Sequence, residues 1–217
     1  MNKFYELHIA LQWGIAILLS LIMMVILGFW IDATSDNLLN WLLVFLVIPL
    51  FQFMGTPLFR LLGMYTYLSP MLLVYGANEK QYDLHNGTSF DYLLLMRGVK
   101  PGMNWRRRLL QFYLEGLLKI VAKLEREELP TSIEVRGSSY FFSESTAKRL
   151  GFELKETGGM EKFNIVINYL DLLWMYSLAH GRWRWPNLQS VKTASISGEK
   201  LLFAKADLER LYRYLTR

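Results

Sequence analysis

The chain has 217 residues, of which 53% are hydrophobic and 20% are charged, and its formal net charge at pH 7 is +5. It contains no cysteine, which excludes disulfide bonds, thiolate zinc sites and cysteine nucleophiles. The charge is unevenly distributed, because residues 1–76 hold 2 basic and 3 acidic residues whereas residues 77–217 hold 22 and 16. A basic domain beside an apolar one suggests attraction to anionic lipid head groups as readily as to nucleic acid.

Two apolar segments near the N-terminus are long enough to cross a bilayer. Residues 9–31 have no charged side chain, and residues 38–59 repeat this pattern after a connector that contains Asp32 and Asp36. A span needs roughly 20 apolar residues. The sequence therefore predicts a transmembrane hairpin with spans at about residues 9–31 and 38–59.

The second span contains prolines, which remove a backbone hydrogen bond and bend a helix. We expect a bent spanning helix, and the alternative is a break near Pro49 that makes part of the segment re-entrant. Residues 61–75 are apolar but too short to span, so we expect an interfacial segment that leads into a first strand at residues 71–75.

Basic residues indicate the orientation of this hairpin. The connector has no Lys or Arg, whereas basic residues follow the second span, and basic loops stay in the cytoplasm. Trp30 and Trp41 flank the connector, where interface anchors are expected. We predict a multi-pass protein of a bacterial inner cell membrane with both termini in the cytoplasm.

Residues 77–217 predict a cytoplasmic α+β domain. Asn86-Gly87 is a strong hairpin signal and predicts strands at 81–85 and 88–96. Apolar residues at three- and four-residue steps predict one amphipathic helix over 104–128. Further strands are expected at 132–135, 152–155 and 162–168, the last two around Gly158-Gly159, and further helices at 144–150 (capped by Ser143), 171–180 and 206–216. The predicted fold class is α+β: an N-terminal two-helix transmembrane hairpin followed by a small mixed α+β soluble domain.

The run Thr146-Ala147-Lys148-Arg149-Leu150-Gly151-Phe152 resembles the helix-to-strand ending of acetyltransferases of the GNAT type, in which an Ala…Leu-Gly-Phe run is common. The resemblance covers seven residues and implies a helix followed directly by a strand. The pyrophosphate-cradling loop of that family is not visible in the sequence. We therefore transfer no functional residue and predict no cofactor.

Polar residues gather around the Asn86-Gly87 turn. His85 and Asp91 supply an imidazole and a carboxylate, which are the groups that acid–base catalysis uses. The alternative is that the polar side chains satisfy the backbone of the turn and that His85 only flanks it. No pair of histidines has metal-ligand spacing on a helix face, so we predict no metal site.

Two basic–aromatic runs are candidates for contact with anionic lipid or phosphate. Trp105 precedes Arg106, Arg107 and Arg108, and a second run contains Arg182, Trp183, Arg184 and Trp185. Arginine next to tryptophan is typical of a membrane interface. The alternatives are a solvated basic face with the tryptophans packed inward, and nucleic acid, for which no recognised module is present.

Together these features predict an integral membrane protein with a membrane-apposed cytoplasmic domain. We expect an accessory, assembly or regulatory component whose partners are the bilayer, its anionic head groups, and a protein partner or a second copy of the chain. The alternative is a membrane-bound transferase that acts on a lipid or lipid-linked substrate, with His85 and Asp91 as acid–base groups.

Overall fold

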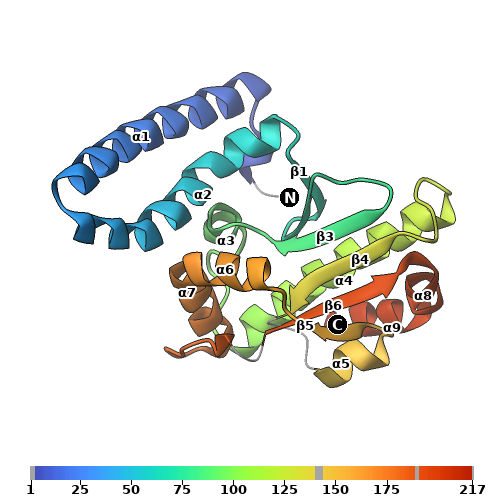
Figure 1. The fold of residues 1–217 in the computed structure, drawn as a ribbon. Coiled ribbons are helices and arrows are strands. Elements are labelled where there is room, and N and C mark those ends of the chain that lie inside the picture. The colour runs from blue at the N-terminus through green and yellow to red at the C-terminus, as the bar shows by residue number, and fades with distance from the viewer. Residues whose placement is uncertain (1–2, 140–143, 189–190, 217) are drawn as a thin grey trace.

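The computed structural model describes residues 3–139, 144–188 and 191–216 (Figure 1). It has the α+β fold that the sequence predicts: a pair of long apolar helices followed by a small domain built on a mixed sheet of six strands. The strand order is β1-β2-β3-β4-β6-β5. The strands are β1 Tyr65–Ser69, β2 Leu72–Tyr75, β3 Gln81–Asn86, β4 Glu134–Ser139, β5 Glu153–Glu156 and β6 Lys192–Ser197.

Among the described strands only β3 and β4 pair in parallel, and all the other neighbours are antiparallel. The pairing of β3 with β4 ends at Leu84 and Gly137, although β3 continues to Asn86. β4 continues beside β6 instead, as far as Ser139 opposite Lys192. The two parallel strands therefore separate at their C-terminal ends, and the candidate site lies at this separation.

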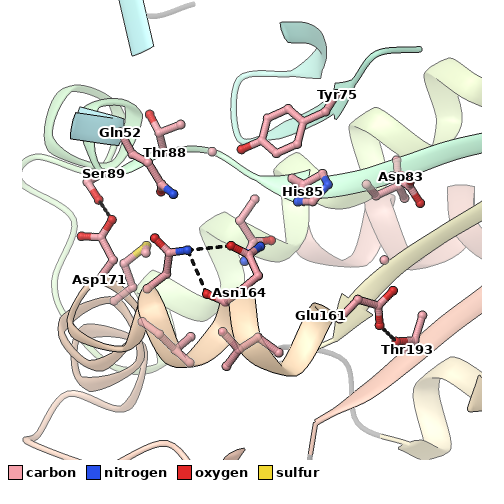
Figure 2. Close-up of a pocket in the computed structure, with 18 of the residues that line it drawn as sticks. Gln52, Tyr75, Asp83, His85, Thr88, Ser89, Glu161, Asn164, Asp171 and Thr193 are labelled. Atoms are coloured by element: carbon pink, nitrogen blue, oxygen red, sulfur yellow. Dashed lines mark hydrogen bonds between the residues drawn. The ribbon is translucent and has the colours of Figure 1, made fainter. Parts of the chain in front are cut away.

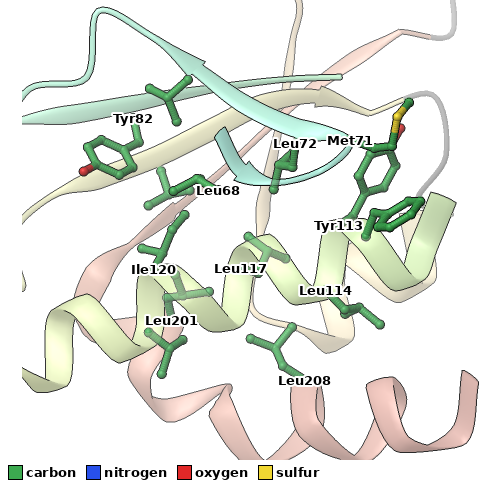
Figure 3. Close-up of a cluster of buried hydrophobic side chains, with 14 of the residues drawn as sticks. Leu68, Met71, Leu72, Tyr82, Tyr113, Leu114, Leu117, Ile120, Leu201 and Leu208 are labelled. Atoms are coloured by element: carbon green, nitrogen blue, oxygen red, sulfur yellow. The ribbon is translucent and has the colours of Figure 1, made fainter. Parts of the chain in front are cut away.

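One face of the sheet packs on α4 (Met103–Glu125), which confirms the amphipathic helix expected at 104–128. Leu114, Leu117 and Ile120 lie between the sheet and the two C-terminal helices, α8 (Gly198–Phe203) and α9 (Lys205–Thr216) (Figure 3). Tyr82 and Leu84 of β3 belong to this core. Because side chains alternate along a strand, Asp83 and His85 project from the opposite face.

The N-terminal hairpin consists of α1 (Ile9–Asp36), the 3₁₀ turns of η2 (Leu38–Leu43) and α2 (Val44–Leu61), after a short η1 (Lys3–Glu6). α1 and α2 are long and apolar enough to cross a membrane. α2 is a single helix that contains Pro49 and Pro57, so the alternative break at Pro49 is wrong. The hairpin packs against the α+β domain, because α2 also contacts α3 (Ser89–Leu95), α6 (Gly159–Ile167) and α7 (Tyr169–His180).

Two expected strands are helices. Residues 89–95 form α3, because Thr88 and Asp91 make a capping box at its start. Residues 162–167 belong to α6. The Glu161 carboxylate caps the first turn of this helix by accepting a hydrogen bond from the Gly158 N–H (3.4 Å). In both cases Gly and polar residues that resemble a hairpin turn instead begin a helix.

The segment expected at the interface, residues 61–75, contains both β1 and β2. Since β2 pairs with β3, the sheet draws strands from both sides of the expected domain boundary near residue 76. The helix and strand implied by the acetyltransferase resemblance are present as α5 (Glu144–Arg149) and β5. Ser143, the expected cap of α5, lies outside the described residues.

Candidate functional site

A cavity of about 370 Å³ lies at the separation of β3 and β4, on the sheet face opposite α4 (Figure 2). Its floor is formed by β3 and β4, and α6 and α7 form a wall. Gln52 reaches it from α2, within the apolar hairpin. The polar side chains that line it are Gln52, Tyr75, Asp83, His85, Asn86, Thr88, Ser89, Arg136, Glu161, Asn164, Asn168, Asp171 and Thr193.

His85 faces this cavity from β3. Its ring stacks on Tyr75 of β2, with the ring centroids 4.0 Å apart. No hydrogen bond joins its ring nitrogens to any described residue. Burial lowers the pKa of His85, although the Asp83 and Glu161 carboxylates oppose this effect. The imidazole is therefore neutral at pH 7, with one nitrogen able to accept a proton or a hydrogen bond.

Asp83 and Arg136 form an ion pair across the parallel strands. Gln81 donates to both carboxylate oxygens of Asp83, at 2.8 Å each. Burial alone would raise the pKa of Asp83, but the hydrogen bonds from Arg136 and Gln81 lower it. The one arginine in the cavity wall is thus already neutralised.

Two further carboxylates that line the cavity, Glu161 and Asp171, form no ion pair within 4 Å with any described residue. Glu161 accepts a hydrogen bond from the Thr193 hydroxyl (2.7 Å), and Asp171 accepts one from the Ser89 hydroxyl (2.5 Å). The Trp174 indole also donates to Asp171 (3.0 Å). With the Asp83–Arg136 pair neutral, the cavity has an excess of negative charge and many amide and hydroxyl groups.

Asp91 does not line the cavity. It is fully buried in α3, where its carboxylate accepts hydrogen bonds from the Tyr67 hydroxyl (2.6 Å) and from the Thr88 N–H and hydroxyl (3.1 Å each). Burial raises the pKa of Asp91. The guanidinium of Arg60 lies over the rings of Tyr5 and Tyr67, 3.3 and 4.5 Å from their centroids.

We call Tyr5, Arg60, Tyr67 and Asp91 the junction cluster, because it joins η1, the end of α2, β1 and α3. His85 and Asp91 therefore lie in different environments. They do not form the acid–base pair that the sequence suggested, since only His85 reaches the cavity.

The two arginine runs lie at one corner of the domain, away from the cavity. The Gly102 N–H, just before α4, donates to the Leu178 carbonyl near the end of α7 (2.8 Å), which brings the two runs together. Arg107 donates to the Leu215 carbonyl (2.8 Å) and so caps α9. Arg108 lies over the Phe112 ring, and Arg184 over the Tyr176 ring. Arg106 and Arg182 are exposed, and contact of these arginines with anionic lipid or phosphate stays a prediction.

The five of the seven tryptophans that were expected as interface anchors differ in their surroundings. Trp30 and Trp41 contact each other edge to face at the connector, and the Trp30 indole donates to the Asn40 carbonyl (3.0 Å). Trp183 and Trp185 are exposed and contact each other. Trp105 is only 5% exposed and stacks on Tyr92 in the core. This corrects its expected role as an interface anchor, because it has no surface to offer a bilayer.

The sequence did not single out most of the cavity. Glu161, Asn164, Ile165 and Asn168 line it at helical spacing, but this pattern was hidden because residues 162–168 were expected to form a strand. Arg136 and Thr193 come from β4 and β6, whose pairing no local pattern predicts. The shared orientation of Asp83 and His85 on β3 was the one available signal.

Comparison with protein-family models, with curated proteins and with solved structures found no match. Within the described residues, no three His, Cys, Asp or Glu side chains gather as a metal site would require.

Proposed function

We propose that this chain is an integral membrane protein, anchored by the α1–α2 hairpin, whose α+β domain lies against the cytoplasmic face of the membrane and binds a polar ligand in the His85 cavity. The observation that supports this most strongly is the place of the cavity. Gln52 of the apolar hairpin and His85 of the sheet both line the cavity. A ligand bound there touches the membrane anchor and the domain together.

The hairpin itself supports the membrane anchor. Large apolar side chains remain exposed along it, including Met24 (66%), Phe29 (73%) and Leu38 (82%). A continuous apolar surface of this length is costly in water and is expected in lipid.

The domain presents further apolar side chains beside α2, and these support its position against the bilayer. The exposed apolar residues of α3, α6, α7 and the loop after α7 are Leu93, Leu94, Phe163, Val166, Leu170, Trp183 and Trp185. We call them the apposed surface. In Figure 1, α3, α6 and α7 lie on the side of the domain nearest α2, and contacts between these helices and α2 agree with that view. Exposed Arg182 and Arg184 border Trp183 and Trp185, as at a lipid head-group region.

Binding without catalysis fits an accessory or regulatory component of the membrane. A second candidate is a transferase that acts on a lipid or lipid-linked substrate, and His85 favours it. A neutral imidazole with free ring nitrogens in a cavity can act as a general base. In this candidate Asp91 has no chemical role, because the Tyr67 and Thr88 hydrogen bonds keep it away from the cavity.

The cysteine-free chain allows a direct test of topology. Ser35→Cys, in the last turn of α1, and Lys100→Cys, before α4, are both at exposed positions. A membrane-impermeant maleimide should label Ser35→Cys in intact cells, and Lys100→Cys only in inside-out vesicles. Equal labelling of both variants from one side would contradict the proposed hairpin.

The cavity is tested by filling it. We expect a small molecule to remain with the wild-type chain extracted in styrene–maleic acid particles and to be detected by mass spectrometry. Asn164→Trp should remove it by occupying the cavity. Lys162→Trp, on the same helix but outside the cavity, should retain it. Retention of the same molecule by both variants would reject the cavity as the binding site.

A further inference from the structure

An apolar groove of about 330 Å³ lies between α2, α3 and α7. Its apolar walls are Leu46, Pro49, Leu50 and Phe53 from α2, Leu93 from α3, and Trp174 from α7. Leu46 and Leu93 are 58% and 57% exposed, so the groove is accessible from the protein surface at these two side chains. One whole side of it belongs to the helix that anchors the chain.

The groove adjoins the His85 cavity. Ser89 and Asp171 are the polar residues that line the groove, and both also line the cavity. Their mutual hydrogen bond of 2.5 Å therefore stands at the boundary between an apolar and a polar space. A molecule that occupies both spaces has a hydrocarbon part on one side of this bond and a polar part on the other.

The charges of the cavity indicate which polar part fits. Arg136 is neutralised by Asp83, and no other cation from the described residues lines the cavity. Glu161 and Asp171 leave an excess of negative charge, which repels a phosphate and attracts hydrogen-bond donors. Neutral His85 and the amides of Gln52, Asn86 and Asn164 add acceptors and donors suited to hydroxyl groups.

Resting on the proposed function, we infer that the ligand is a membrane lipid whose hydrocarbon chain lies in the α2–α3–α7 groove and whose head group, rich in hydroxyl groups, lies in the His85 cavity. The occupant of the groove is a lipid chain because the groove is continuous with the apolar surface of the hairpin. The lipid reaches the cavity from the bilayer beside α2 and passes the Ser89–Asp171 bond.

The test uses the full chain in phosphatidylcholine nanodiscs with two photoactivatable lipids that have the same diazirine-labelled chain. One is a glucosyl diacylglycerol and the other is a phosphatidic acid. We expect the glucosyl lipid to label Trp174 and the α2 residues of the groove, and the phosphatidic acid to label them about tenfold less, the ratio that a loss of about 1.4 kcal/mol in binding produces.

A pair of variants on α3 completes the test. Leu93→Trp fills the groove and should remove the labelling of Trp174, whereas Leu94→Trp, one residue further and outside the groove, should keep it. The comparison of the two lipids on the wild-type chain remains decisive if Leu93→Trp does not fold.

Each other outcome rejects a separate statement. Labelling of the exposed Ile17 and Leu21 on α1 without labelling of Trp174 would overturn the groove and leave the membrane anchor intact. Equal labelling of Trp174 by both lipids would overturn the head-group assignment. Absence of labelling on α1 as well would reject the proposed membrane protein itself.

Discussion

The junction cluster and the His85 cavity arise from one short stretch of sequence, yet they have different physical roles. His85 and Asp91 are six positions apart, on either side of Asn86-Gly87. Asp91 is buried and its carboxylate has hydrogen-bond partners on β1 and at the start of α3, whereas the His85 ring nitrogens have no partner among the described residues. A buried carboxylate oxygen that accepts several hydrogen bonds stabilises the fold, and a group without a partner in a cavity is available to a ligand.

The largest effect should follow the loss of Asp91. Asp91→Ala removes the capping box of α3 and leaves the buried Tyr67 hydroxyl without its acceptor, so we expect a loss of about 3 kcal/mol in the free energy of unfolding. Denaturant unfolding of the full chain in detergent measures it. Asp207→Ala, at an exposed position of α9, is the control and should change stability little. Equal losses in the two variants would place Asp91 outside the stabilising cluster.

Tyr67→Phe tests the same cluster more gently. It removes only the hydroxyl that donates to Asp91 and keeps the ring beneath Arg60, so the expected loss is about 1 kcal/mol. Thermal unfolding with Tyr214→Phe as the exposed control measures this difference. A loss no greater than that of the control would mean that the Tyr67 hydrogen bond is not stabilising.

The contribution of His85 to the free energy of unfolding should depend on pH. Its pKa is lowered in the folded chain, so as pH falls below about 6.5, the usual histidine value, the unfolded chain binds a proton that the folded chain does not. Stability should therefore decrease on acidification, with a slope below about 1.4 kcal/mol per pH unit from this residue.

Unfolding of the wild-type chain and of His85→Gln at pH 7.5 and 5.5 measures that slope. His8 and His180 remain in both proteins and serve as the internal reference. An identical pH dependence of the two proteins would show that the folded environment does not disfavour the His85 cation.

The smallest effect is expected for the contact of Arg182 and Arg184, which border the apposed surface, with lipid head groups. Anionic phosphatidylglycerol nanodiscs should slow amide hydrogen exchange at residues 182–185 of the full chain about twofold relative to phosphatidylcholine, because exposed arginines gain only modest energy from head groups in salt. Replacing Arg182 and Arg184 with Gln should remove the difference. Arg126→Gln, at the exposed end of α4, should not. No dependence on lipid charge would argue against head-group contact at this corner.

Local patterns were sufficient for the parts of the fold that need no distant partner. The lengths of the two apolar segments predicted α1 and α2, and the spacing of leucines predicted α4 and its end before Pro130. Local patterns predicted strands where residues 89–95 and 162–167 form helices. The Gly and short polar residues before these segments are compatible both with a hairpin turn and with a helix start. The capping interactions of Asp91 and Glu161 with backbone N–H groups favoured helices.

The sequence by itself determined that this chain has a long apolar hairpin, a basic α+β domain and a strand with Asp83 and His85 on one face, because length, charge and periodicity are local properties. Only the tertiary structure decided which polar groups share a cavity. The parallel pairing of β3 with β4 brings Arg136 to Asp83 across 53 positions, and the contact of α3 with α7 brings Asp171 to Ser89 across 82. Such pairings depend on the closure of long loops and on packing of whole elements, which residue types in a short window do not encode.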